Sequence, residues 1–275
     1  MNRRNGQIVR WVAAIIAAMV LTSPIAWMVI LSLTPQQELV RGAPSLTPSR
    51  LSLEHYHRVW TETSFPQFVA NSCKVSAIVT IIALPLALCG GYALSRFRFR
   101  GRRTIGLTLL ASQMLPAILL AVPLYATMAA IGLIDTHASL IICYATFALP
   151  FSCWMMRGFL DGLPVQIEEC AQIDGCSRLR TLWSIVLPIS TPGLAAAGAL
   201  IFLLAWNEYL FAMVFINSEQ LKTYPVGITA FISRFGADYG ALMASSVIVS
   251  VPVVLVFLLL QRHMISGLTA GAVKG

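Results

Sequence analysis

The amino-acid sequence predicts an all-α membrane protein with six transmembrane helices. Of its 275 residues, 57% are hydrophobic and only 11% are charged, whereas roughly a quarter of the residues in a water-soluble domain are charged. Six apolar runs are long enough to cross a bilayer, which takes about 20 residues of helix. Arginines and lysines gather between these runs, so the net charge of +8 indicates membrane topology rather than a nucleic-acid partner.

The six runs are expected to form the transmembrane helices in chain order. They cover residues about 11–33, 75–95, 104–134, 138–156, 193–216 and 239–260. The first run carries no charge and is too long for the apolar part of a signal peptide. The third exceeds one span, so we expect it to tilt or to extend beyond the hydrocarbon. Prolines inside the runs predict ordinary helix kinks or, alternatively, hinges of a moving pathway.

The distribution of arginine and lysine predicts which helix ends face the cytoplasm. Most of these residues lie in the N-terminal segment, the loop RFRFRGRR (96–103), the loop after the fourth run and the C-terminal tail. We therefore expect both termini in the cytoplasm, and a multi-pass protein of the plasma or inner membrane. RFRFRGRR is interpreted as a topology anchor, with a patch for lipid headgroups as the alternative. The whole chain, 1–275, is expected to form one transmembrane domain.

Common catalytic motifs are missing from the sequence. No lysine completes a GxxxxGK[ST] pattern, so the chain lacks that phosphate-binding loop for ATP. GxSxG and HExxH do not occur. His55 and His57 lie two apart without a third metal ligand nearby, and the cysteines show no CxxC spacing. An integral membrane enzyme is therefore poorly supported, and we expect no cofactor or metal ion on this chain.

Two polar residues interrupt the fifth apolar run. The stretch AWNEYLFA places Asn207 and Glu208 among apolar neighbours. A carboxylate in a membrane span is energetically unfavourable and normally faces a bundle interior or a water-filled cavity. Asn207 and Glu208 are therefore candidate pathway or gate residues. The alternative is a position near the outer interface, where Glu208 faces water or a partner helix.

A polar connection at about residues 159–192 joins the fourth and fifth runs. It contains EECAQIDGCSRLRTLWSIVLPISTP, which predicts a helix, a glycine turn and a second helix. Pro164 suits a first helical position, and Gly175 suits a left-handed turn after the first helix. Ser177 can cap the second helix, which Pro188 and Pro192 are expected to end.

Both short helices are expected to be amphipathic. In the first, an apolar face is formed by Ile167, Cys170 and Ala171, and the acids Glu168 and Glu169 are expected to be exposed. The second has an apolar stripe, formed by Cys176, Leu179, Trp183 and Val186. Such a helix suits docking into a groove of a partner protein. The alternative, a helix lying on the membrane, is disfavoured because the anionic inner leaflet repels acids.

This connection resembles a known family. ECAQIDGC followed by IVLP is similar to the EAA loop of binding-protein-dependent ABC importer permeases, although Cys170 and Cys176 replace the usual alanines. The resemblance implies a coupling helix held in a cleft of a cytoplasmic ATPase, with Glu169 facing a basic residue. The implied coupling residues are Glu169, Ala171, Asp174, Gly175, Leu179 and Pro188.

AWNEYLFA and the C-terminal GLTAGAVKG resemble the MalG-like half of the maltose or carbohydrate type of these permeases. This implies a MalF-like second permease, an ATPase homodimer that holds ATP and Mg, and an extracytoplasmic solute-binding protein. The tail would reach the ATPase through Gly267, Thr269, Gly271 and Lys274. A loop with Asn217, Glu219 and Lys222 would contact the binding protein.

The resemblance implies a permease subunit of an ATP-driven sugar importer, which forms the translocation pathway with the second permease. Two alternatives remain open. One is a permease for glycerol phosphate or a related solute. The other is a proton-coupled secondary transporter that uses the carboxylate of Glu208.

Overall fold

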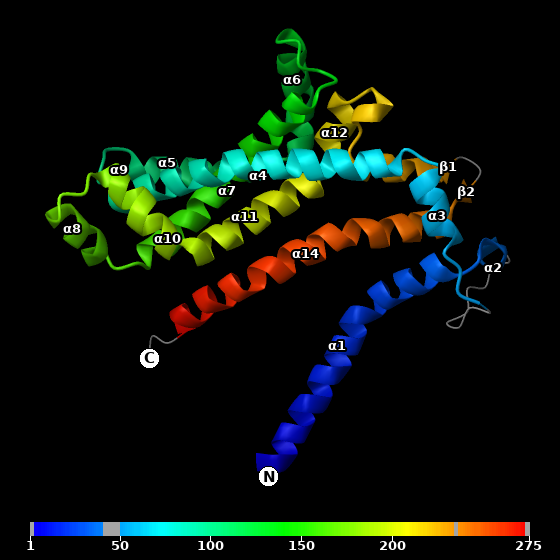
Figure 1. Ribbon diagram of the computed structural model, residues 1–275. Coiled ribbons are helices and arrows are strands. Elements are labelled where there is room, and N and C mark those ends of the chain that lie inside the picture. Colours follow the sequence, from blue (N-terminus) through cyan, green and yellow to red (C-terminus); the bar gives the residue numbers. More distant parts are fainter. Residues whose placement is uncertain (1–2, 41–49, 234–235, 273–275) are drawn as a thin grey trace. The chain divides into compact units, whose positions relative to one another are not determined.

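The computed structural model describes residues 3–40, 50–233 and 236–272, which are mostly helical (Figure 1). The chain divides into two compact units. Unit 1 contains Met1–Pro66 and Gly227–Val251, and unit 2 contains Gln67–Val226 and Pro252–Gly275. Each unit is described by itself.

Unit 1 is built from the N-terminal helices and a small hairpin. Its elements are α1 (Arg3–Leu33), α2 (Gln36–Val40), α3 (Glu54–Thr61), η3 (Ile228–Phe231), β1 (Ile232–Ser233), β2 (Gly236–Ala237) and the first part of α14 (Tyr239–Ala272). The two strands pair antiparallel, with Ile232 opposite Ala237.

A buried histidine organises the packing of unit 1. His55 is 1% exposed, and its Nε2 lies 2.9 Å from the carbonyl oxygen of Thr34. Its ring fills the space above Gly240, where an added Cβ would lie 2.0 Å from the ring. Arg58 forms an ion pair with Asp238, and Asp238 also accepts a hydrogen bond from the backbone of Ala241 in α14. His55 thus packs between α3 and α14.

Unit 2 holds the remaining helices. They are α4 (Phe65–Arg96), α5 (Arg102–Ser112), α6 (Ala117–Ala130), α7 (His137–Asp161), α8 (Gln166–Ile173), α9 (Arg178–Thr181), the π-helix η1 (Leu182–Val186), α10 (Leu187–Ile189), α11 (Thr191–Trp206), α12 (Leu210–Phe215), the 3-10 helix η2 (Glu219–Leu221) and α13 (Tyr224–Gly227). Helices α8 and α9 lie together at one end of α4 and α7, whereas α6 and α12 lie toward the other end (Figure 1).

Four helices in the described part of the chain are long and apolar enough to cross a membrane. They are Arg10–Leu33 within α1, α4, α7 and Tyr239–Gln261 within α14. Two bent pairs raise the number to six if each is counted as one span. Large apolar side chains on these elements remain exposed, such as Ile81 and Val122, as expected of helices that face lipid. These helices confirm the predicted fold class, a helical membrane protein with four to six candidate spans.

The third and fifth apolar runs are not the continuous spans predicted at 104–134 and 193–216. α5 and α6 meet at 98°, because Pro116 has an extended backbone just before α6 and disfavours helix in the residue before it. α11 ends at Trp206 and forms an 81° pair with Arg178–Ile189 instead. As predicted, that second helix ends before Pro192, but Pro188 lies within it and follows a π-helical turn. Proline lacks the backbone N–H that would donate the usual helical hydrogen bond. The wider π-helical turn before Pro188 accommodates this missing bond.

The core of unit 2 lies where α4, α7 and α11 pack together. Its buried side chains include Val75, Val79, Leu140, Tyr144, Ile201 and Phe211. α4 approaches α7 closely at Gly91, where an added Cβ would lie 2.7 Å from Cβ of Met156. Small residues allow this approach between membrane helices. The packed helices provide a rigid base for the polar loops at both ends.

Candidate functional site

The helix-turn-helix loop (residues 159–192) has the shape that the sequence predicts. α8 ends at Ile173, and Gly175 follows with a φ of +85°. The amide of Cys176 donates to the carbonyl of Ala171 at 2.9 Å, and that of Gly175 to Gln172 at 3.1 Å. These paired bonds are a Schellman motif, which favours glycine at the left-handed position.

The second helix of this loop begins at its predicted cap. The Ser177 hydroxyl accepts a hydrogen bond from the Arg180 amide at 3.3 Å. Pro164, however, precedes α8 by two residues instead of occupying its first position. The turn chemistry was therefore predicted correctly, and the start of the first helix was placed slightly too early.

Glu168 is buried, which contradicts the prediction that it is exposed. It is only 4% exposed, and its Oε1 lies 2.6 Å from Nε of Arg96 at the end of α4. Its other oxygen accepts a hydrogen bond from the Tyr92 hydroxyl at 2.8 Å. A buried carboxylate requires such partners, because desolvation of an unpaired charge is unfavourable. The glutamate therefore faces α4, while Glu169 remains exposed.

Arg96 holds three parts of unit 2 together. Besides Glu168, its guanidinium donates to the backbone carbonyl of Leu163, just before α8, at 3.1 Å, and to the Ser95 hydroxyl at 3.1 Å. Ser95 in turn donates to Asp161 at the end of α7 at 2.6 Å. The helix-turn-helix loop is thus fastened to the ends of both α4 and α7.

The outward surface of the loop combines acidic and apolar side chains. Glu169, Cys170 and Asp174 are exposed, and so are Ile173 at 84% and Leu179 at 70%. The predicted apolar face is divided, because Ala171 is buried whereas Ile167 and Cys170 are exposed. In the predicted stripe of the second helix, Val186 is buried, Cys176 is half-buried, and Leu179 and Trp183 are exposed. Exposed apolar side chains beside acids are typical of a surface that interacts with a partner or with the membrane.

The loop therefore gathers most of the predicted coupling residues, in different settings. Glu169, Asp174 and Leu179 are exposed near the turn, which Gly175 forms. Ala171 packs inward, and Pro188 lies farther along in α10.

Asn207 and Glu208 lie at the break between α11 and α12. The two carboxylate oxygens of Glu208 accept hydrogen bonds from the amides of Phe211 at 2.9 Å and Ala212 at 3.2 Å. Asn207 accepts one from the Tyr224 hydroxyl at 3.0 Å. Glu208 thus caps α12, where a negative charge also complements the helix dipole. This capping role was not predicted from the sequence.

Glu208 also lines a cavity of about 380 Å³ in unit 2. The other lining residues include Ser112, Gln113, Tyr144, Phe147 and Phe211. Among the described residues, neither arginine nor lysine lines it. Aromatic surfaces beside hydroxyl, amide and carboxylate groups are typical of sites for polar, uncharged ligands.

The loop at residues 217–224 is fixed mainly through its backbone. The Asp135 carboxylate accepts hydrogen bonds from the Asn217 and Ser218 amides, both at 2.9 Å, and from the Ser218 hydroxyl at 2.5 Å. These bonds, those from Ser218 foremost, lower the pKa of Asp135. The Asn71 amide donates to the carbonyls of Gln220 at 2.8 Å and Lys222 at 2.9 Å.

Among the predicted binding-protein residues, Asn217 and Glu219 are exposed and Lys222 is half-buried. Asp135 and Asn71 were missed, because each lies far along the chain from the loop that it fixes.

The predicted tail residues lie at the end of the chain. The backbone of Gly267, Thr269 and Gly271 belongs to α14, but their side chains are outside the described part. Lys274 lies outside the described residues altogether. Across residues 3–40, 50–233 and 236–272, no three His, Cys, Asp or Glu side chains could hold a metal ion together.

Comparisons with known proteins agree on one family. Residues 80–269 match the binding-protein-dependent transport system inner membrane component family. The chain is 38% identical over 254 residues to the inner membrane ABC transporter permease protein YcjP of Escherichia coli, covering 92% of this chain and 91% of that relative. It is 36% identical over 267 residues to the trehalose/maltose transport system permease protein MalG of Thermococcus litoralis, covering 96% and 95%.

A solved structure supports the same fold. It is described as a bacterial ABC transporter involved in the import of the acidic polysaccharide alginate. One of its chains matches with a TM-score of 0.81 and 25% identity, covering 95% of this chain and 98% of that one.

Proposed function

This chain belongs to the family of binding-protein-dependent transport system inner membrane components, and we propose that it forms half of the pathway of an ATP-driven sugar importer. It is a non-catalytic permease subunit, so ATP is hydrolysed by a separate ATPase. The relatives named for trehalose and maltose transport support a carbohydrate as the substrate. The rest of the pathway is formed by a second, MalF-like permease.

The exposed surface of the helix-turn-helix loop is the observation that carries the coupling role. Glu169 and Asp174 offer negative charge, while Ile173 and Leu179 offer uncovered apolar area on the same short segment. Removal of that area from water drives association at about 25 cal/mol per Å², and the acids select a cleft with basic residues. In this proposal the partner is a cytoplasmic ATPase homodimer, which binds ATP and Mg. Its cleft supplies both the apolar surface and the basic residues.

Movement of the docked loop reaches the spans through the contacts around Arg96. The ion pair between Arg96 and Glu168 connects α8 to α4, and the bonds from Ser95 to Asp161 connect α4 to α7. Through α9, η1 and α10 the chain continues directly into α11. Closure of the ATPase would therefore displace several helices together and expose the sugar path alternately to the two sides. Such coupling is reciprocal between the two sites.

The setting of Glu208 favours ATP coupling over proton coupling. Both of its oxygens are engaged by the first amides of α12, so its charge has a structural role without any proton transfer. We place it, with Asn207, beside the sugar path. The side chains described around the cavity at Glu208 include aromatic, amide and hydroxyl groups but no basic one. This composition favours a neutral sugar over a glycerol phosphate.

The 217–224 loop is proposed to contact the extracytoplasmic binding protein. Its exposed side chains, Asn217 and Glu219, lie on a backbone held by Asp135 and Asn71. A preorganised loop loses little entropy on binding. This assignment places α8 and both chain termini in the cytoplasm, where the C-terminal tail meets the ATPase.

Reconstitution of the whole importer tests the proposal. The chain, its partner permease, the ATPase and the binding protein are placed in vesicles, and uptake of a panel of sugars and glycerol phosphate is measured. We expect ATP-dependent uptake of a di- or oligosaccharide and none of glycerol phosphate. Uptake that persists with an ATPase-dead partner, or that follows a proton gradient, would contradict the proposal.

A further inference from the structure

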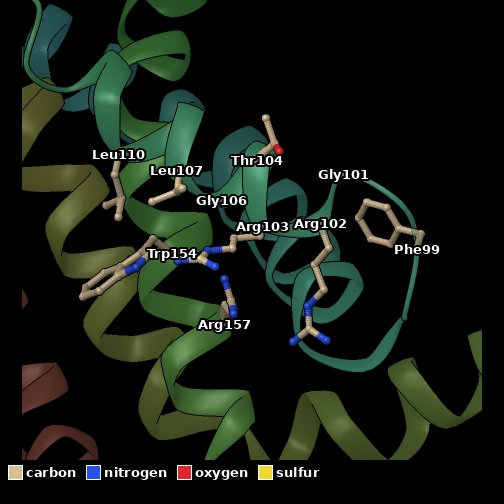
Figure 2. Close-up of a pocket in the computed structure, with 10 residues that line it drawn as sticks. All are labelled: Phe99, Gly101, Arg102, Arg103, Thr104, Gly106, Leu107, Leu110, Trp154 and Arg157. Carbon is tan, nitrogen blue, oxygen red and sulfur yellow. The ribbon is translucent and has the colours of Figure 1, made fainter.

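A second cavity of unit 2 collects positive charge. It has a volume of about 660 Å³ and lies between the start of α5 and the last turns of α7 (Figure 2). Arg102, Arg103 and Arg157 line it together with Trp154 and Phe99. Figure 2 shows the side chains of Arg103 and Arg157 extending toward one another.

The positive charge in this cavity is largely uncompensated. Arg157 has an acidic partner, Asp161, with Nε and Oδ2 3.5 Å apart, and the other oxygen of Asp161 accepts a bond from Ser95. Arg102 donates to the backbone carbonyl of Ser95 at 3.2 Å. Within the described residues, Arg103 forms neither a hydrogen bond nor an ion pair. Neighbouring like charges repel, so an anion between these guanidinium groups would stabilise their arrangement.

The backbone of α5 leaves room for the guanidinium of Arg157. Gly106 is buried against it, and an added Cβ would lie 3.1 Å from NH1 of Arg157. A side chain at position 106 would thus push the guanidinium away from α5. The planar donor fork of arginine suits phosphate oxygens, which it can bind in a bidentate manner.

The rim of the cavity is apolar and exposed. Leu107 is 57% exposed, Trp154 is 44% exposed and Phe99 is 41% exposed. α4 and α7 are both candidate spans, and the arginine-rich connection to α5 begins at the end of α4. Tryptophan is enriched where membrane helices meet the headgroup region. The cavity therefore combines an arginine-lined floor with an apolar, exposed rim.

We propose that this cavity binds the phosphate headgroup of an anionic phospholipid such as phosphatidylglycerol. The inference rests on the proposed topology, which places the cavity at the cytoplasmic leaflet, where anionic headgroups meet basic pockets between helices. Arg103 and Arg157 contact the phosphodiester, and Trp154 lies beside the glycerol and upper acyl chain. A soluble phosphate shares the first interaction but lacks the second.

Native mass spectrometry of the complete importer complex tests this site. Phosphatidylglycerol and phosphatidylcholine with the same acyl chains are titrated onto the detergent-solubilised complex. The variant Arg103→Gln/Arg157→Gln is compared with Arg98→Gln/Arg100→Gln, which removes the same charge from exposed positions that do not line the cavity. The single variant Arg103→Gln guards against misfolding, because Arg103 loses no hydrogen bond or ion pair to the part of the chain that the structure describes.

We expect the cavity variant to bind phosphatidylglycerol roughly 30-fold more weakly and the single variant roughly fivefold, from about 1 kcal/mol per arginine. The control pair should bind as the wild type does, and phosphatidylcholine should bind weakly to all. If both double variants lost phosphatidylglycerol binding equally, diffuse surface charge would explain the binding and the cavity would not. If millimolar inorganic phosphate displaced the lipid, the cavity would be assigned to a soluble anion. If the cavity variant lost the ATPase but bound the lipid unchanged, the cavity would be assigned to a protein contact. Each of these three results overturns the proposal.

Binding is measured independently of transport, so this test separates the two proposals. If uptake is absent but phosphatidylglycerol still binds selectively, the importer assignment fails while the lipid site stands. If uptake is normal and lipid binding does not depend on Arg103, the lipid site fails alone.

Discussion

The helix-turn-helix loop and the 217–224 loop are both polar connections proposed to meet partners, but they are fixed by different chemistry. The first is held by a buried ion pair, in which Arg96 and Glu168 side chains are 10% and 5% exposed. The second is held through its backbone, whose amides donate hydrogen bonds to Asp135 and whose carbonyls accept them from Asn71. A charged pair couples two helices strongly, whereas backbone anchoring fixes a shape and leaves side chains available. We infer that the first loop transmits movement and the second presents a surface.

The largest expected effect comes from Arg96→Ala. The change leaves the Glu168 carboxylate buried without its cation, which destabilises a protein by about 3–5 kcal/mol. Asn71→Ala, in α4, removes two neutral hydrogen bonds to the other loop, worth about 1 kcal/mol each, and one from Gln67 within the same helix. Thermal unfolding of the two purified variants should therefore show the greater loss for Arg96→Ala. Arg96→Met combined with Glu168→Gln should recover much of the stability, because neither charge is then left unpaired.

Equal destabilisation by Arg96→Ala and Asn71→Ala would remove the distinction between the loops. If Arg96→Met combined with Glu168→Gln were fully stable but had lost ATP-driven uptake, the distinction between the loops would be sharper. The ion pair would then serve transmission in addition to folding.

The next effect is expected from Glu169→Lys, which reverses an exposed charge on α8. The change should lower ATP-driven uptake by about 10- to 100-fold, because a like-charge contact in an interface costs several kcal/mol. Membrane insertion and stability should be unaffected. Co-purification of the ATPase measures docking, and Gln172→Lys, exposed on the same helix, is the matched control. Normal docking and uptake in Glu169→Lys would refute the assignment.

Gly175→Val should have an intermediate effect, through the turn. A left-handed residue with a side chain costs about 1–2 kcal/mol, and the φ of Gly175 is +85°. Asparagine tolerates this region better, so Gly175→Asn should retain more ATPase binding than Gly175→Val. The same order in uptake is expected, and indistinguishable variants would mean that the turn does not need glycine.

The smallest effect is expected at Asp135, which anchors the other loop. The hydrogen bonds from Ser218 and Asn217 lower its pKa, so they favour the folded loop fully above about pH 4, the ordinary aspartate value. This contribution is lost as the pH falls through the lowered pKa. Asp135→Ala should accelerate hydrogen exchange of the Asn217 and Ser218 amides and leave α8 unchanged. Glu219→Ala is the control, and faster exchange there as well would contradict the role of Asp135.

Local chemistry made much of the helix-turn-helix loop predictable. Gly175 and Ser177 specify a turn and a cap through bonds to residues a few positions away, and both are found. The same local view failed for Glu168, because its partner Arg96 lies 72 residues away along the chain. Asp135, 82 and 83 residues from the amides that it binds, was missed for the same reason.

Hydropathy predicted the membrane class but not the bends. An apolar run shows length and polarity, so 104–134 and 193–216 were predicted as continuous spans. Pro116 marks the first bend, and Asn207 and Glu208 mark the end of α11. Glu208 was predicted as a pathway residue from its unfavourable setting, whereas its capping bonds depend on where α12 begins. The direction of a chain after a break is set by tertiary packing, which periodicity does not contain.

Site-specific photo-crosslinking from both loops tests the central assignment most directly. A photoreactive residue replaces Ile173, which is 84% exposed on α8, or Glu219, which is exposed on the 217–224 loop. In the complete importer with its binding protein, we predict ATPase adducts from position 173 and binding-protein adducts from position 219. ATPase adducts from position 219, or none from position 173, would contradict the account.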